Sequence, residues 1–247
     1  MVTDMGRFSN ADHPRDPAGR WTHKNTPADR GNLADLATQT EPASPLPADP
    51  AERAHAALIS TDPVLLDRLG TDVDWQVRQT VAANPATSSL RLSWLADDHE
   101  ELVREAAAGN PSTPPRSLME IVERDPVDLV AVTAVTNPAF GPEGFAAAAR
   151  SRSPRVRCAA AGSPACPAGV LGGLAGDRNP AVRHAVASNP AAAADVLDRL
   201  AAGSPSERHA VAANPGAPDR VLDWLAVADP DAAVRTVAAA SLKARRR

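Results

Sequence analysis

The most regular charged feature of this 247-residue sequence is an Asp followed six residues later by an Arg. The pattern occurs at Asp72 and Arg78, Asp98 and Arg104, Asp177 and Arg183, and Asp229 and Arg235. A row of guanidinium groups could bind an acidic ligand, because Arg forms paired hydrogen bonds with carboxylate or phosphate oxygens. We favour a structural interpretation, in which each Asp caps the start of a helix and pairs with the Arg of its own or the next unit. A feature that recurs this often indicates a role that the units share.

The residue directly after this recurring Arg, or after its equivalent in the other units, varies in character, and we expect it to face solvent. It is occupied in turn by Gln79, Glu105, Val132, Cys158, His184, His209 and Thr236. His184 and His209 would lie about 10 Å apart if successive helices pack at the usual spacing, which is far for one metal ion. We therefore interpret them as surface histidines. Function is expected where the units differ, so Gln79, Glu105, His184 and His209 are candidates for contact with a partner.

Searches for catalytic motifs find no Gly-rich phosphate loop, no Gly-x-Ser-x-Gly elbow and no His-Glu-x-x-His in the sequence. The two cysteines, Cys158 and Cys166, cannot form a metal site by themselves. The residues thus predict no enzyme, no cofactor, no metal and no small-molecule substrate.

The elements that carry these side chains are internal repeats. Residues 77–85 (VRQTVAANP), 103–111 (VREAAAGNP) and 182–190 (VRHAVASNP) are versions of one phrase. The Pro that ends each version lies at 85, 111, 138, 164, 190 and 215, at intervals of 26, 27, 26, 26 and 25 residues. Short units of constant length predict a stacked array, in which each unit covers the apolar face of its neighbour.

Each unit can be interpreted as two helices. The first carries Leu-x-x-Leu spacing, as at Leu92 and Leu95, and the second carries Val four residues before a small apolar residue, as at Val103 and Ala107. Both spacings place the two side chains on one helical face. The Asn-Pro pair predicts the end of the second helix, because Asn tolerates the left-handed conformation and Pro disfavours helix at the residue before it.

The phrase Val-Arg-x-x-Val-Ala-x-Asn-Pro, followed by Leu-x-x-Leu-Ala-x-Asp, resembles the leucine-rich repeat variant family, a relative of HEAT repeats, from about residue 57 to 242. The resemblance implies an all-α, right-handed α-solenoid of about seven units, whose first helix is 3₁₀ in part. An iron–sulfur cluster held by N-terminal cysteines occurs in that family. Because residues 1–157 contain no Cys, we expect no cluster here.

Three parts are predicted along the chain: a disordered N-terminal arm (1–50), the repeat array (51–242) and a basic tail (243–247). The arm is rich in Pro, Asp, Ser, Thr and Asn and has no helical or strand period. Within it, residues 12–24 resemble a short His-Pro-Arg-Asp-x-x-Gly-Arg-aromatic segment found in actinobacterial and phage proteins. Trp21 with Arg20 could anchor a partner there, or the segment could be a linker with an incidental Trp.

Trp94 and Trp224 occupy the same position of two units, where other units carry Arg68, Gly173 and Arg199. That position therefore need not be buried. Two interpretations remain open: the tryptophans are exposed binding residues, or each indole covers the edge between two layers.

Charge and composition narrow the function. The array holds 17 basic and 23 acidic side chains, a net charge of −6, which disfavours nucleic acid. The start has no signal-peptide pattern and no long apolar run occurs, so we expect a cytoplasmic protein without a membrane segment; its bias towards Arg, Ala and Pro is typical of bacteria. We predict a non-enzymatic protein–protein interaction scaffold with an unidentified protein partner. The alternatives are a HEAT-like nucleic-acid-binding or DNA-repair protein resembling DNA glycosylases, and a phage- or defence-associated accessory protein.

Overall fold

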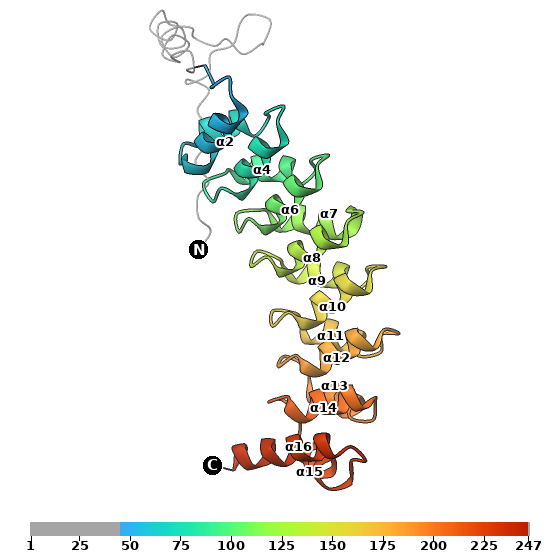
Figure 1. Cartoon of the computed structure of the whole chain (residues 1–247). Helices are drawn as coiled ribbons and strands as arrows, with labels where there is room; N and C mark the ends of the chain where they lie inside the picture. Colours follow the sequence, from blue (N-terminus) through green and yellow to red (C-terminus); the bar gives the residue numbers. More distant parts are fainter. Residues whose placement is uncertain (1–44, 247) are drawn as a thin grey trace, which may run out of the picture. The chain divides into compact units, whose positions relative to one another are not determined.

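The computed structural model describes residues 45–246, which contain the repeat array (Figure 1). The array lies within residues 47–247, which form one compact unit. Every regular element in the described residues is an α-helix, and successive helices stack in layers from α2 to α16 (Figure 1). The predicted all-α solenoid is confirmed.

Seven two-helix units follow one opening helix, α2 (Pro50–Ile59). The first helices of the units are α3 (Pro63–Leu69), α5 (Ser89–Leu95), α7 (Pro115–Arg124), α9 (Pro142–Ala148), α11 (Ala168–Leu174), α13 (Ala194–Leu200) and α15 (Asp219–Ala228). The second helices are α4 (Trp75–Ala83), α6 (Glu101–Gly109), α8 (Asp128–Thr136), α10 (Pro154–Gly162), α12 (Pro180–Ser188), α14 (Pro205–Ala213) and α16 (Ala232–Arg245).

The first helices are α-helical throughout, which corrects the expectation that they are 3₁₀ in part. Bonds of the 3₁₀ type occur at the helix ends: at the start of α11 the N–H of Val170 donates to Pro167 O (2.9 Å), and after α5 that of Asp97 donates to Trp94 O (3.1 Å). Such tightening is common where an α-helix ends. In α7 and α15 the helix continues for three more residues instead.

Short polar residues and Pro begin many of the helices. Asp62, Ser153 and Asn179 each accept a backbone N–H at the start of α3, α10 and α12, and Pro follows each of them. The side chain satisfies one of the unpaired N–H groups at the helix start, and Pro lacks the N–H that would be left unpaired. These caps let helices of seven to ten residues begin at defined positions.

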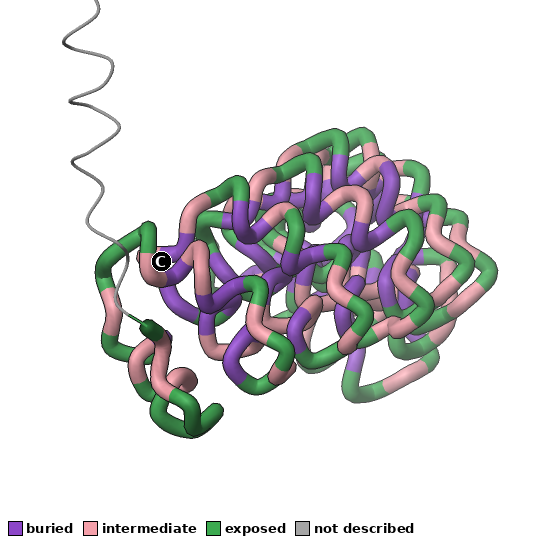
Figure 2. The backbone as a smooth tube through the Cα atoms, turned by 90° about the horizontal axis from the view of Figure 1, so that it is seen from above, coloured by how far each residue is buried: buried purple, intermediate pink, exposed green. Residues whose placement is uncertain are grey.

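The core runs along the inside of the stack, where Leu side chains of the first helices meet Val side chains of the second. Leu66, Leu92, Val77 and Val103 are fully buried. Figure 2 shows buried backbone inside the layers and exposed backbone at the outer turns. A single unit could not bury these side chains, so each depends on its neighbours.

Two other features concern the limits of the array. α16 continues to Arg245, so residues 243–245 are helical and do not belong to a tail. No helix within residues 45–246 has the length and apolar character needed to cross a lipid bilayer.

Candidate functional site

The Asp and Arg series forms a ladder between units. In each rung the Arg of one second helix pairs with the acid that follows the next first helix, at N–O distances of 2.6–2.8 Å. The six pairs are Arg53–Asp72, Arg78–Asp98, Arg104–Asp125, Arg157–Asp177, Arg183–Glu207 and Arg208–Asp229. Each acid thus pairs with the Arg of the preceding unit, not with that of its own or the next unit.

The same guanidinium also closes the turn within its own unit. Nη1 of Arg78 donates to the carbonyl of Asp72 (2.8 Å) while Nε and Nη2 donate to the carboxylate of Asp98 (2.7 and 3.0 Å). The planar guanidinium has enough donors to serve both partners at once. An Arg therefore contacts the backbone of the Asp six residues earlier and the carboxylate of the next unit.

The ladder carboxylates also cap the turns that hold them. Asp72 Oδ1 accepts the N–H of Asp74 at 2.9 Å, and Asp177 Oδ1 accepts that of Asn179 at 2.8 Å. Hydrogen bonds from Arg53, Arg157 and Arg208 hold the pKa of Asp72, Asp177 and Asp229 below the ordinary value of an Asp. These acids and arginines are thus occupied by the fold, which argues against their serving as a ligand site.

One rung is absent and another is rebuilt. At the junction of α8 and α10, Ala131 stands in the position of the Arg and Ser151 in the position of its acid, so both partners are missing together. Gly203 stands in the acid position of a later unit, where Glu207 supplies the carboxylate. A Cβ on Gly203 would lie 2.0 Å from Glu207 Oε2, so only Gly leaves room for this replacement.

A second ladder, which the sequence analysis missed, is formed by the Asn residues of the Asn-Pro pairs. Asn110 Nδ2 donates to the carbonyls of Ala82 (2.7 Å) and Asn84 (2.9 Å) in the preceding unit, and its Oδ1 accepts the N–H of Ser112 (2.9 Å). Asn84, Asn137, Asn189 and Asn214 repeat the arrangement. All five are buried.

The geometry of these Asn residues corrects the predicted reason for their presence. Asn84 has φ −74° and ψ 124°, and the other four lie close to the same extended conformation, so none is left-handed. Their amide groups instead satisfy carbonyls at the C-terminal end of the neighbouring helix, which would otherwise be buried without a partner. A polar residue recurring among apolar ones was the available signal.

The variable positions lie along the second helices. Gln79, Glu105 and His184 are half-buried between layers, and only His209 of the four candidates is exposed. His184 Nδ1 lies 2.9 Å from Ser206 Oγ and 3.1 Å from Ser206 O. The described residues contain no group of three or more His, Cys, Asp or Glu side chains that could hold a metal ion.

Both tryptophans at the shared position of the first helices face solvent. Trp94 is 59% exposed and Trp224 is 51% exposed. The guanidinium carbon of Arg91 lies 4.6 Å from the centroid of the Trp94 ring, and Arg91 also donates to Asp67 (3.1 Å). One indole face is therefore covered by a guanidinium of the same helix, which an acid of the neighbouring unit holds in place, while about half or more of each Trp side chain remains exposed.

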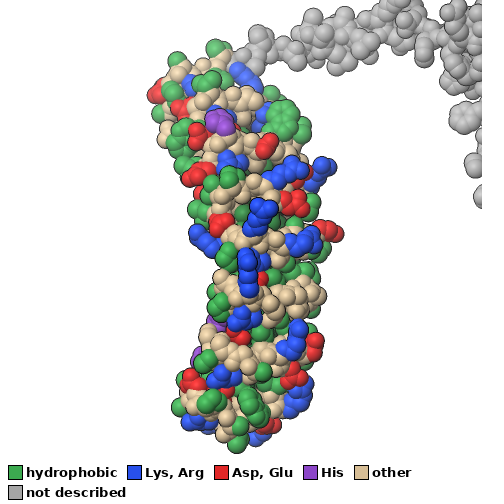
Figure 3. Space-filling model, turned by 90° about the vertical axis from the view of Figure 1, so that its right-hand side faces the viewer, with side chains coloured by type: hydrophobic (Ala, Val, Ile, Leu, Met, Phe, Trp, Pro, Cys, Tyr) green, Lys and Arg blue, Asp and Glu red, His purple; other side chains and the backbone are tan. Residues whose placement is uncertain are grey.

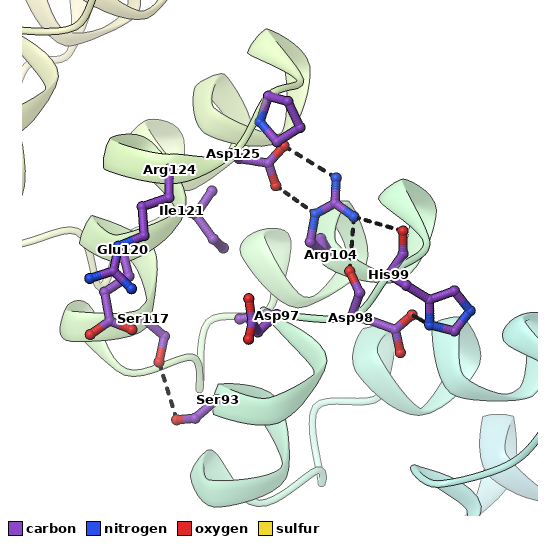
Figure 4. A pocket seen from close by; sticks show the side chains of 12 residues that line it. Ser93, Asp97, Asp98, His99, Arg104, Ser117, Glu120, Ile121, Arg124 and Asp125 are labelled. Atoms are coloured by element: carbon purple, nitrogen blue, oxygen red, sulfur yellow. Dashed lines mark hydrogen bonds and ion pairs between the residues drawn. The ribbon is translucent and has the colours of Figure 1, made fainter.

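Shallow cavities lie between neighbouring first helices. One of about 430 Å³ lies between α5 and α7, where Asp97, Glu120 and Arg124 line it and Ser117 Oγ donates to Ser93 Oγ at 3.1 Å (Figure 4). Others of about 560 Å³ and 340 Å³ lie between α3 and α5 and between α13 and α15. Trp224 lines the last of these.

The four basic residues that could have lined a groove for nucleic acid lie in two different environments. Arg152 and Arg155 are exposed, whereas Arg157 and Arg183 belong to ladder rungs. On the long face shown in Figure 3, acidic side chains lie among the basic ones. The geometry thus offers no groove built from those four arginines.

The remaining predicted residues lie at the C-terminal end of the array or outside the described residues. Arg235, in the last unit, donates to the carbonyls of Asp229 and Pro230. Arg245, expected in the tail, donates to the carbonyls of Pro215 and Ala217 and pairs with Asp219, so it closes the end of the stack. Arg20 and Trp21 lie outside the described residues.

Both cysteines are free thiols. Cys166 is buried, and burial raises its pKa to about 11. Such a thiol is protonated at neutral pH and is a poor nucleophile.

Residues 183–242 match the family model of the Leucine Rich Repeat Variant domain. A solved leucine-rich repeat variant, described as having a novel repetitive protein structural motif, superposes with a TM-score of 0.61 at 27% identity, covering 78% of this chain and 77% of that one. The YibA protein of Escherichia coli aligns over 82% of this chain and 77% of its own, at 17% identity and a TM-score of 0.39. The search of curated proteins found no match. The helical array of this chain is therefore similar in fold to the solved leucine-rich repeat variant, and its last units match that family's model, which is the resemblance that the repeated phrases indicated.

Proposed function

We propose that this protein is a non-enzymatic scaffold that binds a protein partner along the face formed by its first helices, here called the first-helix face. The observation that carries the proposal is the exposure of Trp94 and Trp224 at one repeat position. Arg, Glu, Ala or Gly occupies that position in the other units, so the fold does not require Trp there. Large exposed aromatic side chains are typical of binding hot spots.

The cavities support the same face. Three cavities lie between successive first helices, and exposed Val64 and Leu90 line the one between α3 and α5. Another, of about 390 Å³, lies on the second helices α8 and α10. A partner that follows the stack could place successive side chains in the first three. Their open form suits a macromolecular surface better than the enclosed pocket that a small molecule requires.

A nucleic-acid partner is less well supported. Binding to nucleic acid needs clustered positive charge that is free to meet phosphates. Here the ladder arginines are committed to carboxylates, and the array is net acidic. We also propose a cytoplasmic location; the accessory role in phage or defence rests on residues outside those described.

The test is capture of a partner by the full chain from a lysate of its source organism, followed by affinity measurement with the identified protein. Trp94→Arg together with Trp224→Arg introduces the residue that other units carry, so the fold should persist. We expect the double variant to weaken binding at least about 30-fold, because hot-spot side chains contribute about 2 kcal/mol or more.

Leu129→Ala is the matched control, since Leu129 is an exposed apolar residue on α8, a second helix. It should leave the affinity unchanged. If no protein is captured reproducibly, or if the Trp variant binds as well as the control, the proposed surface is wrong. Loss of binding on Trp21→Ala alone would move recognition to the N-terminal segment.

A further inference from the structure

The junction between α8 and α10 differs from the other junctions of the array in its polar contacts. The ladder rung that would join the two units is missing, because Ala131 and Ser151 replace the Arg and the acid. Ala131 is 3% exposed and has no side-chain hydrogen-bonding group. The guanidiniums of the two neighbouring rungs, Arg104 and Arg157, each make four hydrogen bonds, and these bonds have no counterpart at this junction.

The Asn ladder is interrupted at the same junction. Ser163 follows α10 where Asn ends the other second helices, and its Oγ accepts the N–H of Ala165 at 3.4 Å within its own turn. By the pattern of Asn110 and Asn137, an Asn here would reach back to the end of α8. Within the described residues, no hydrogen bond from the Ser163 side chain to the preceding unit is found.

The contacts that remain are mostly apolar. One polar link persists, from Ser153 Oγ to Asp128 Oδ2 at 2.7 Å. Nearby, Phe140 and Phe145 pack edge to face with centroids 4.9 Å apart; other units carry Thr, Cys or Ala at the first position and Leu at the second. Apolar packing is non-directional, whereas a bidentate ion pair fixes both the distance and the angle between its groups.

From these two coincident interruptions we propose that the α8–α10 junction is a hinge between two stiffer segments, α2–α8 and α10–α16. Within each segment, every pair of successive second helices is joined by an Arg–acid rung, an Asn rung or both, and at the last junction Ser241 Oγ donates to Ala212 O (2.7 Å). Trp94 belongs to the first segment and Trp224 to the second. Bending at the hinge changes the spacing of the two tryptophans, which would adapt the scaffold to its partner; only this consequence rests on the proposed function.

The experiment measures distance distributions between pairs of spin labels by pulsed electron paramagnetic resonance. The labels are placed on exposed residues at one repeat position, two residues before the recurring Pro. The pair 109 and 162 spans the α8–α10 junction, while the pairs 83 and 136, and 162 and 213, span two units without it. Gly162 has open space for a side chain, and a Cβ on Gly109 meets Thr133 only at 3.6 Å.

The native thiols are first removed by Cys158→Ser and Cys166→Thr, the latter being the residue found at the equivalent position at Thr87 and Thr113. We expect the 109–162 distribution to be broader than both control distributions. Equal widths for the three pairs would overturn the proposal, and this comparison needs no variant of the ladder.

Two sets of substitutions then test the cause. Ala131→Arg, Ser151→Asp and Ser163→Asn restore both rungs and should narrow the 109–162 distribution to the width of the controls. Arg104→Ala, Asp125→Ser and Asn137→Ser create the same gap between α6 and α8 and should broaden the 83–136 distribution. If both sets fold, as judged by circular dichroism, and neither width changes, the missing rungs are not the origin of the hinge.

Discussion

At the scale of residues, the ladder arginines act as connectors whose two partners lie in different units. Arg157 donates to Ser151 O within its unit and to both carboxylate oxygens of Asp177 in the next. Both side chains are less than a tenth exposed. Removing one partner of such a buried pair leaves the other charge without compensation, which is more costly than removing both.

The pair Ala131 and Ser151 shows that the stack tolerates the joint loss, and this leads to a double-mutant cycle. We expect Arg157→Ala to lower the free energy of unfolding by about 3 kcal/mol. In the Arg157→Ala background, Asp177→Ser should lower the free energy of unfolding much less than it does in the natural protein. The coupling energy between the two substitutions should be about 1–3 kcal/mol. Urea unfolding of the four proteins measures the cycle. Additive effects would mean that the pair contributes no interaction of its own.

At the scale of elements, the first helix of the fourth unit is adapted to a large side chain. Phe140 stands where the other units carry the smaller Thr, Cys or Ala, and its ring lies where a side chain at position 144 would be. A Cβ on Gly144 would approach the ring to 2.7 Å. α9 therefore accepts a Gly in its buried face because the ring takes that space.

This arrangement predicts that the effect of Gly144→Ala on the free energy of unfolding changes sign when Phe140 is replaced by a smaller residue. In the natural sequence, Gly144→Ala should destabilise the protein by about 1–3 kcal/mol through overpacking. In a Phe140→Thr background the same substitution should stabilise it by about 1 kcal/mol, because Ala favours helix over Gly and the space is free. Denaturant unfolding of the single and double variants checks both signs. A loss of stability in both backgrounds would contradict the steric explanation.

At the scale of the whole molecule, stability is distributed along the stack and is concentrated in features shared by its units. The ladder carboxylates of Asp72, Asp177 and Asp229 have pKa values lowered chiefly by hydrogen bonds from their arginines. For Asp98, burial by itself raises the pKa. Hydrogen bonds from Arg78 and from the N–H of Glu100, together with the charge of Arg78, outweigh the effect of burial, so the pKa of Asp98 is lowered overall. The same small contribution is thus repeated along the array.

Because the pKa values of these carboxyl groups are lowered in the folded protein, its free energy of unfolding depends on pH. A carboxyl whose pKa is lower when folded stabilises the protein fully above the pKa of an unfolded Asp, about 3.9, and loses that contribution as the pH falls further. We therefore expect the free energy of unfolding to fall steeply below about pH 4. Denaturant unfolding between pH 7 and pH 2.5 measures the slope.

Asp72→Asn combined with Asp229→Asn should lower stability at neutral pH and reduce that slope, because fewer carboxylates remain to be protonated. Asp195→Asn changes an exposed carboxyl outside the ladder and serves as the control for charge. An unchanged slope in the ladder variant would exclude these carboxylates as the source of acid sensitivity.

The sequence by itself determined the features that depend on local periodicity: the repeat length, the two helices in each unit and the recurrence of Asp and Arg. These follow from spacings of three, four and about 26 residues, which are visible along the chain. It did not reveal the Asn ladder, since the local conformational preference of Asn offered a sufficient explanation for Asn-Pro.

Only the tertiary structure decided which groups meet across the layers. The pairing of Arg78 with Asp98, the reach of Asn110 to Ala82 and the use of Glu207 in place of an acid at Gly203 join residues of different units. Such contacts depend on how far each layer is rotated and shifted over the one before. That geometry is set by the packing of Leu and Val side chains, and the spacing of residues within one unit contains no record of it.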